Sequence, residues 1–411
     1  MKRLQAFKFE LTPNGEQERD IRRFAGSRRF VYNRALELQK ANYAAGGKFI
    51  VYFSMTKHLT EWKKETEWLK ESPSQILQQS LKDAERAFKN FFEKRAAFPC
   101  RKKKGRSDSF RFPQGFEIDQ GNSRIKLPKL GWIRYRNSRD ISGTAKNITV
   151  SQSGGKWFAS IQTEREVEQP VSTATSAIGI DMGVVRLATM SDGSFIEPLG
   201  SFKKHETRLR RYQRKMSRKV KFSKNWCKSR RKVQKIYTRI ANARKDFLHK
   251  ATTEISKNHA MVAIEDLQVR NMSKSSKGTT DAPGKNVAAK SGLNKAILDQ
   301  GWFEFRRQLE YKLNWNGGVL VSVPAYYTSQ TCPTCGHVAK ENRKTQARFV
   351  CVDCGHAANA DVVGAMNVLA RGYRVAACGE DVRRAKVARQ KCAASAKQEP
   401  TEATRRELSH V

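Results

Sequence analysis

The sequence predicts an α+β protein of several domains, in which an α/β domain with a metal-binding insert follows an N-terminal β-barrel that carries an inserted helical region. Three observations favour this fold class. Short strand patterns fill residues 118–166, basic helical patterns fill residues 203–250, and buried strands alternate with helices from residue 178 to residue 324. At 411 residues the chain is long enough for two or three domains with separate cores.

The charge of the chain indicates the kind of partner it binds. Eighty Lys and Arg stand against 39 Asp and Glu, a net charge of +41. So large an excess calls for a polyanion, and nucleic acid is the leading candidate. No apolar run approaches the ~18–20 residues needed to span a bilayer, and we expect no signal peptide. We therefore expect a cytoplasmic protein, on the nucleoid when bound to DNA, with no membrane partner; nothing indicates oligomerisation.

The N-terminal elements begin with a strand. Residues 4–12 alternate apolar and polar positions and end at Pro13-Asn14-Gly15. Helical spacing follows in residues 21–38 and again in residues 77–92, and we expect residues 48–57 to be a short connecting segment between these helices. Residues 4–12 can supply the first strand of the barrel, which would make the helical region an insertion into it.

A basic loop with interleaved aromatic residues begins at Phe98. Its run Arg101-Lys102-Lys103-Lys104 can pair with phosphates while neighbouring aromatic rings stack on bases. A solvated charge run is the alternative for so short a tract. The barrel strands follow, with Ser153-Gly154-Gly155 as a hairpin turn.

Residues 203–250 contain twenty Lys and Arg but only two acids, Glu206 and Asp246. Apolar residues recur at helical spacing, so we expect two basic helices that are interrupted near residues 221–225. Their cationic faces, which include Arg210-Arg211 and Arg230-Arg231, are candidate contacts to a phosphate backbone. The alternative is again a solvated surface.

Two buried strand patterns end in an acid. The run Ile178-Gly179-Ile180-Asp181-Met182-Gly183 places a carboxylate between two glycines, and the run Met261-Val-Ala-Ile-Glu265 repeats the feature. An ionised carboxylate in an apolar interior requires a cation or several donors, and Mg²⁺ is the obvious cation, although a cap or a turn is the commoner role for such an acid. We expect the glycines beside Asp181 to leave room for a scissile phosphate.

The order of elements after residue 176 is strand, strand, helices, strand, helix, strand. We expect one long helix around residues 298–309 and a buried strand at residues 318–324. This order is compatible with an RNase H-like sheet that has helices on its faces.

Four cysteines have the spacing of a metal site. Cys332 and Cys335 form one pair, Cys351 and Cys354 form a second pair, and fifteen residues separate the pairs. Four thiolates fill the coordination sphere of one tetrahedral Zn²⁺, so the metal would be structural, with redox dithiols as the alternative. His337 and His356 lie close to these cysteines in the sequence, but four thiolates already complete the coordination of the metal.

A third acid, Asp361, precedes a helical pattern at residues 362–369. An N-cap aspartate is one reading of it. The other is a third metal ligand, since Asp181, Glu265 and Asp361 could converge on two Mg²⁺ ions that activate a water and the leaving 3′ oxygen.

Several motifs together resemble the TnpB family, the transposon-encoded RNA-guided DNA endonucleases related to type V CRISPR effectors. The motifs that carry the resemblance are Ile-Gly-Ile-Asp181-Met-Gly, Ile-Glu265-Asp-Leu, Thr328-Ser-Gln-Thr-Cys-Pro-Thr-Cys-Gly, Asn-Ala-Asp361-Val-Val-Gly-Ala-Met-Asn, Phe30-Val-Tyr-Asn33 and Leu127-Pro-Lys-Leu-Gly131. They occur in order over nearly the full length.

The resemblance implies a domain organisation. The segments are 1–12, first strand of a wedge β-barrel; 13–97, helical recognition region; 98–172, wedge β-barrel; 173–326, first part of a RuvC-like nuclease domain; 327–358, zinc-binding insert that contacts target nucleic acid; 359–376, last part of the nuclease domain; and 377–411, a tail with no packing pattern that we expect to be disordered.

The resemblance also implies an activity. It implies a Mg²⁺-dependent endonuclease that a guide RNA from the transposon end directs to double-stranded DNA beside a short motif, near which family members use the positions of Tyr52 and Gln78. Some relatives have lost the acids and act as RNA-guided repressors, which is the alternative function. Many relatives also have Asp-Arg before the last acid, where this chain has Asn359-Ala360. A transposase that joins DNA ends would need a nucleophilic Tyr or Ser constellation, and none stands out.

Overall fold

The computed structural model describes residues 1–345 and 347–377. The predicted tail therefore lies outside the described residues, apart from Ala377. The chain divides into two compact units. The first consists of Met1–Glu168 and Tyr212–Thr238, and the second consists of Gln169–Arg211 and the described residues from Arg239 onward. None of the described helices is both long enough and apolar enough to cross a membrane.

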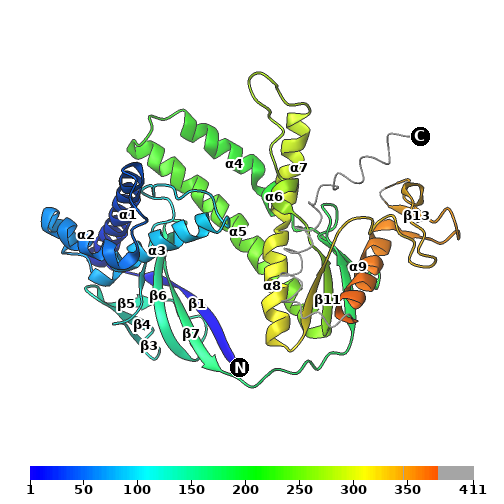
Figure 1. The fold of residues 1–411 in the computed structure, drawn as a ribbon, viewed down its shortest axis with the longest axis horizontal. Coiled ribbons are helices and arrows are strands. Elements are labelled where there is room, and N and C mark those ends of the chain that lie inside the picture. The colour runs from blue at the N-terminus through cyan, green and yellow to red at the C-terminus, as the bar shows by residue number, and fades with distance from the viewer. Residues whose placement is uncertain (346, 378–411) are drawn as a thin grey trace, which may run out of the picture. The chain divides into compact units, whose positions relative to one another are not determined.

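The first unit is built on a seven-stranded sheet in the order β2-β6-β7-β1-β5-β4-β3 (Figure 1). The strands are β1 Lys2–Thr12, β2 Ser109–Phe112, β3 Glu117–Asp119, β4 Arg124–Leu127, β5 Gly131–Tyr135, β6 Thr144–Ser153 and β7 Lys156–Glu166. Neighbours are antiparallel throughout, and β1 lies between β7 and β5. The predicted hairpin turn joins β6 to β7 through Gly154 and Gly155, which both have positive φ.

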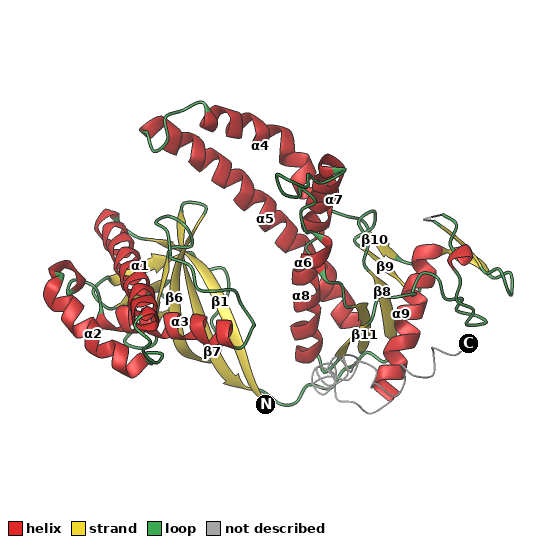
Figure 2. Ribbon diagram, turned by 45° about the horizontal axis from the view of Figure 1, so that its top comes forward, coloured by secondary structure: helices red, strands yellow, loops and turns green. Residues whose placement is uncertain are grey.

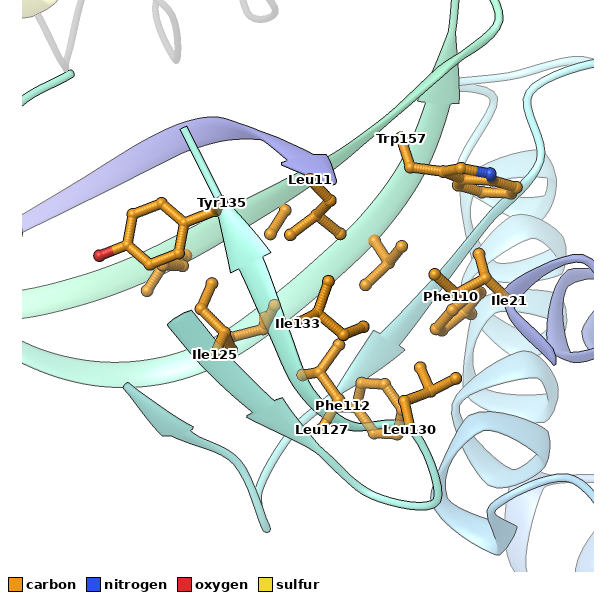
Figure 3. Close-up of a cluster of buried hydrophobic side chains, with 14 of the residues drawn as sticks. Leu11, Ile21, Phe110, Phe112, Ile125, Leu127, Leu130, Ile133, Tyr135 and Trp157 are labelled. Carbon is orange, nitrogen blue, oxygen red and sulfur yellow. The ribbon is translucent and has the colours of Figure 1, made fainter. Parts of the chain in front are cut away.

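Alternating side chains of this sheet form one hydrophobic core with the helices. Phe7, Phe9 and Leu11 of β1 are buried at every second position, as a strand with one covered face requires. Figure 3 shows Ile21 of the first helix beside Phe110 of β2 in this cluster. The sheet therefore shares its core with the helical residues Ile21, Phe24, Ala25 and Ile76.

Three helices follow β1 in the chain: α1 Gly15–Ala44, α2 Tyr52–Glu65 and α3 Ser74–Phe92, with a short 3₁₀ turn at Glu67–Leu69 before α3. Asn14 and Gln17 form a reciprocal capping box at the start of α1. The prediction of a connecting segment at residues 48–57 is wrong, because α2 begins at Tyr52. Its buried face is formed by Met55, Leu59 and Trp62, and this helical spacing continues past residue 57.

The basic stretch forms two helices, as predicted. They are α4 Ser201–Ser217 and α5 Lys224–Asn258, and α5 contributes residues to both units. Leu209 is buried on α4, and Val233, Ile236 and Ile240 are buried on α5. Most of the cations lie on the opposite, exposed faces, as amphipathic helices require.

The second unit contains a five-stranded sheet in the order β10-β9-β8-β11-β12. Its strands are β8 Ala177–Asp181, β9 Ala188–Met190, β10 Phe195–Ile196, β11 Met261–Glu265 and β12 Val319–Val323. The strands β8, β11 and β12 are parallel, and β9 and β10 extend the sheet as antiparallel hairpins. This mixed sheet, together with its helices, agrees with the predicted α+β class.

The helices of the second unit are α6 Val269–Met272, α7 Val287–Gln300, α8 Trp302–Trp315 and α9 Ala360–Ala377. The unit also includes the N-terminal part of α4 and the C-terminal part of α5. The prediction of one long helix around residues 298–309 is wrong. Gly301 has φ +73°, in the left-handed region, and it separates α7 from α8. Between β12 and α9 lie the short 3₁₀ helix η2 Lys340–Asn342 and the hairpin of β13 Arg348–Val350 and β14 Ala357–Asn359.

Candidate metal sites

Two strands bring Asp181 and Glu265 to the same edge of the second sheet. Each acid is the last residue of its strand, Asp181 of β8 and Glu265 of β11. The strands run parallel and pair Ile180 with Ile264. The carboxyl ends of adjacent parallel strands therefore present the two acids side by side, at the edge where such sheets hold their ligands.

Asp361 reaches this edge from the first turn of α9. The side-chain oxygen of Asn359 accepts hydrogen bonds from the backbone N–H groups of Asp361 (3.0 Å) and Val362 (3.4 Å), so Asn359 is the N-cap. The reading of Asp361 as the cap is wrong, and its carboxylate is not used for capping. Asn359 therefore has a structural role in this chain, as the N-cap of α9.

Close packing against the sheet fixes the position of α9. Figure 2 shows α9 beside β8 and β11. A Cβ added at Gly179 would lie 2.2 Å from the carbonyl oxygen of Ala365, and one added at Gly372 would lie 2.6 Å from Cβ of Ala263. The expectation that the glycines beside Asp181 leave room for a phosphate is therefore wrong at Gly179, because the backbone of α9 fills that space.

The three acids influence one another electrostatically. Burial, with the nearby charges of Glu265 and Asp361, raises the pKa of Asp181 to about 7. Burial also raises the pKa of Glu265, against the opposing effects of a 2.7 Å hydrogen bond from Thr328 and the charge of Arg371. The three acids that the sequence singled out therefore lie near one another, and burial and mutual repulsion outweigh the nearby positive charges at Asp181.

Two residues at this site were not predicted as functional. Nη2 of Arg343 lies 3.0 Å from Oδ1 of Asp361, and Arg343 also lowers the pKa of Asp181. Thr328 donates to Glu265, and its carbonyl accepts from the side chain of Asn367 at 2.8 Å. Thr328 begins a motif that carries the family resemblance, whereas Arg343 stands among other basic residues and has no local sequence signal.

The four predicted cysteines form a cluster. Their sulfur atoms all lie within 4.8 Å of one another, and no other group of three or more His, Cys, Asp or Glu in residues 1–345 and 347–377 does the same. The Cys332–Cys354 and Cys335–Cys351 sulfur pairs are 3.6 Å apart. Sulfurs around a tetrahedral Zn²⁺ with bonds of about 2.3 Å are about 3.8 Å apart, so the cluster fits zinc.

Each cysteine pair lies in a turn of the same form. The N–H of Gly336 donates to the carbonyl of Cys332, and the N–H of Gly355 donates to that of Cys351. Both glycines have positive φ, which a side chain would disfavour. The repeated turn explains why a glycine follows the second cysteine of each pair.

The predicted nucleic-acid contacts of the first unit lie on its helices and on the basic loop. Gln78 is exposed on α3, while Tyr52 begins α2 half-buried, with Nζ of Lys82 4.9 Å from its ring centroid. In the loop, Lys103 and Lys104 are exposed and Arg101 pairs with Glu37 at 3.0 Å. Lys102 instead packs on Tyr32, and burial lowers its pKa to about 8.

The arginines predicted on the basic helices are largely accessible. Arg211 and Arg231 are exposed, and Arg210 is exposed beside Glu206 at 2.7 Å. Arg230 lies 5.5 Å from the ring of Trp226. These four arginines lie on α4 and α5, whereas the three acids lie on β8, β11 and α9.

Comparisons with known proteins give related matches along the chain. A family model described as a probable transposase matches residues 160–276, one described as a Cas12f1-like TNB domain matches residues 302–368, and one described as a helix-turn-helix domain matches residues 1–48. In this last segment the structure has the strand β1 and the single helix α1.

Two curated proteins match over nearly their full length. The "Putative RNA-guided DNA endonuclease InsQ" of Escherichia coli K12 is 60% identical over 404 residues, which are 98% of each chain. A "Putative RNA-guided DNA endonuclease" of Streptomyces pristinaespiralis is 36% identical over 97% of each chain. Among solved structures, the cryo-EM structure of a Cas12f1–sgRNA–target DNA complex matches 89% of this chain and 98% of that chain, with a TM-score of 0.55 at 14% identity, a likeness of fold.

Proposed function

The chain belongs to the TnpB family of RNA-guided DNA endonucleases, and on that premise we propose that it hydrolyses DNA with two Mg²⁺ ions held by Asp181, Glu265 and Asp361. The finding that carries the proposal is the convergence of these three acids at one sheet edge, where burial and mutual repulsion raise the pKa of Asp181 to about 7. Such a site is stabilised by cations.

The donor set suits Mg²⁺, because hard carboxylate oxygens are the ligands this ion takes from proteins. The three acids are more spread than the cysteines, since they do not meet within 4.8 Å. Two ions about 3.5–4 Å apart can be shared by a more open set of carboxylates than a single ion can. An open set of three acids therefore suits the proposed pair of ions.

The residues around the acids prepare the site for hydrolysis. Thr328 fixes one oxygen of Glu265, and Asn359 fixes the first turn of α9 and so the direction of Asp361. When bound, the ions would activate a water and stabilise the leaving 3′ oxygen. Arg343, at 3.0 Å from Asp361, holds a cationic group where a phosphate oxygen would approach.

The remaining parts are proposed to direct this nuclease. A guide RNA from the transposon end would choose the target by base pairing, and the protein would read a short adjacent motif with Tyr52 and Gln78. The seven-stranded sheet would be the wedge β-barrel, α1–α3 the recognition region, and the second unit the RuvC-like nuclease domain with its zinc-bearing insert. Exposed cations of the loop and of α4 and α5 would follow the RNA and DNA backbones.

The test compares Asp181→Asn with Asp192→Asn, which changes an exposed acid in the β9–β10 turn. Each protein is purified with its copurifying RNA, which is sequenced to define the target, and is assayed for plasmid cleavage with and without Mg²⁺. We expect Asp181→Asn to lose cleavage by more than about a hundredfold while target binding is kept, and Asp192→Asn to cut normally. Cleavage by Asp181→Asn at the wild-type rate would refute the assignment, and binding without cleavage by the wild-type protein would favour the repressor.

A further inference from the structure

A cleft of about 270 Å³ opens directly beside Glu265 in the second unit. It is formed where the end of β11, the short helix α6 and the start of α8 meet. Its lining includes Glu265, Arg270, Trp302, Phe303 and Arg306. Because Glu265 is part of the wall, a molecule in this cleft would touch the proposed metal site.

Phe303 gives the cleft an exposed aromatic wall. The left-handed turn at Gly301 starts α8 so that Trp302 is buried, with 3% of its surface exposed, whereas Phe303 is 75% exposed. Met182, Leu267 and Val269 complete the apolar part of the lining. A flat ring with a free face beside a polar site is the arrangement on which proteins stack unpaired bases.

The polar groups of the cleft suit an anionic ligand. Arg270 is exposed and makes no ion pair within the described part of the chain, while Arg306 neutralises Asp266 at 2.5 Å. The indole Nε1–H of Trp302 is buried and has no hydrogen-bond acceptor among the described residues. A ligand with phosphate oxygens would meet the free guanidinium of Arg270, whereas the buried indole donor of Trp302 is not accessible to it.

We propose that this cleft is the subsite for the nucleotide next to the scissile phosphate of the DNA strand, with its base stacked on Phe303 and a phosphate paired with Arg270. The inference rests on the proposed function, since it places this nucleotide beside the carboxylates that would hold the ions. Stacking accepts any base, so the subsite would hold the strand without choosing its sequence. It would fix which phosphate reaches the acids.

A strand held at two points is cut at a defined bond, because the reacting atoms must be positioned to within a fraction of an ångström. Loss of the aromatic wall should therefore both slow cleavage and spread the cut over neighbouring phosphates. Guide-directed target binding should be unaffected, because it depends on base pairing and on other surfaces.

The variants for the test are Phe303→Ala, Phe303→Trp, Arg270→Gln and, as control, Tyr373→Ala, which removes a ring that is 52% exposed on α9 and does not line the cleft. The probe is a short oligothymidylate that contains 2-aminopurine, mixed with each protein in Ca²⁺. Stacking on an aromatic ring quenches the fluorescence of 2-aminopurine. Cleavage positions on a guided target are mapped in Mg²⁺.

We expect Phe303→Ala to lose the quenching and to bind the oligonucleotide about tenfold more weakly, with slower and dispersed cleavage, and Phe303→Trp to restore both. Arg270→Gln should weaken binding of the oligonucleotide. It should also reduce the slope of log affinity against log salt concentration by about 1, as expected for the loss of one phosphate contact. If Phe303→Ala quenched the fluorescence and cut the target at the same positions as the wild type, the proposed subsite would be refuted. If the wild-type protein does not cut, the proposed function fails, and the fluorescence result still decides the subsite.

Discussion

Arg343 and Asp361 form an ion pair at 3.0 Å that joins the cysteine-bearing insert to the candidate nuclease site. Arg343 directly follows η2, and the neighbouring Asn342 is buried and bonded to the carbonyls of Gln330 and His337 and to the N–H of Val352. The insert therefore holds its arginine in a fixed place. The guanidinium supplies positive charge to a cluster of acids that otherwise repel one another.

Replacement of Arg343 by Gln should make the protein depend more strongly on Mg²⁺ for stability. Without the arginine, Asp361 loses its partner and the pKa of Asp181 rises further, since Arg343 lowers it. We expect the free energy of unfolding of the metal-free variant to be about 1 kcal/mol lower than that of the wild type at pH 8. We also expect Mg²⁺ to raise the Tm of the variant by more than it raises the Tm of the wild type. Lys250→Gln, which breaks an exposed pair with Asp246, is the control. An equal Mg²⁺ response in Arg343→Gln and wild type would contradict the prediction.

The raised pKa of Asp181 makes a prediction about stability and pH. Between about pH 4 and pH 7 the folded protein holds a proton on Asp181 that the unfolded chain releases, so the free energy of unfolding falls as the pH rises through this window. At pH 8 without Mg²⁺, Asp181→Asn should therefore be more stable than the wild type by about 2 kcal/mol or more, and the difference should vanish near pH 4.

Asp192→Asn is the control, because the pKa of Asp192 is shifted in the opposite direction to that of Asp181. Although burial opposes it, hydrogen bonds from Ser194 hold the pKa of Asp192 below its usual value, so this substitution should bring no gain at pH 8. Chemical denaturation of the metal-free proteins at pH 4 and pH 8 measures both effects. A gain for Asp181→Asn that is equal at the two pH values would show that the carboxylate charge is not its cause.

Much of the candidate site could be predicted because its signals are local. An acid that ends an apolar strand pattern marks Asp181 and Glu265, and the strand order implies that such ends meet at one edge. The cysteine spacing is equally local, since each pair lies within one turn. Asp361 is ambiguous in the sequence, because a helix start accepts either a cap or a ligand, and only the hydrogen bond that the Asp361 N–H donates to the side chain of Asn359 decides between them.

The features that sequence reasoning missed depend on contacts between distant segments. Arg343 meets Asp361 through the fold of the insert, and Gly179 meets α9 across nearly two hundred residues. The break at Gly301 was overlooked because the apolar spacing on its two sides continues one helical pattern. The start of α2 at Tyr52 is hard to predict for a different reason, since two of its three buried residues, Leu59 and Trp62, follow residue 57.

Loss of a zinc ligand should disturb the nuclease site at a distance. Cys332→Ser removes one of four sulfurs, and we expect metal analysis to show a fall from about one Zn²⁺ per chain to less than about a tenth. Because the insert carries Arg343, cleavage should fall as well. Cys227→Ser, a cysteine on α5 outside the cluster, should leave both zinc content and cleavage unchanged. Retention of a full equivalent of zinc by Cys332→Ser would refute a four-sulfur site.

The contact between β8 and α9 can be tested by the smallest side chain. In Gly179→Ala the new Cβ would lie 2.2 Å from the carbonyl oxygen of Ala365 and 2.7 Å from the N of Leu369, and neither backbone atom can rotate away. We expect a loss of about 2–3 kcal/mol in the free energy of unfolding. A shift of α9 by about 1 Å would displace Asp361 and reduce cleavage by about a hundredfold.

Gly292→Ala is the matched control, because a Cβ at this exposed position of α7 meets nothing within 4 Å. Alanine is the better helix former, so this variant should be as stable as the wild type or more stable by about 0.5–1 kcal/mol, with normal cleavage. Denaturant titration and plasmid cleavage are measured on both proteins. If Gly179→Ala matched Gly292→Ala in both measurements, the packing of α9 on β8 would not be what positions Asp361.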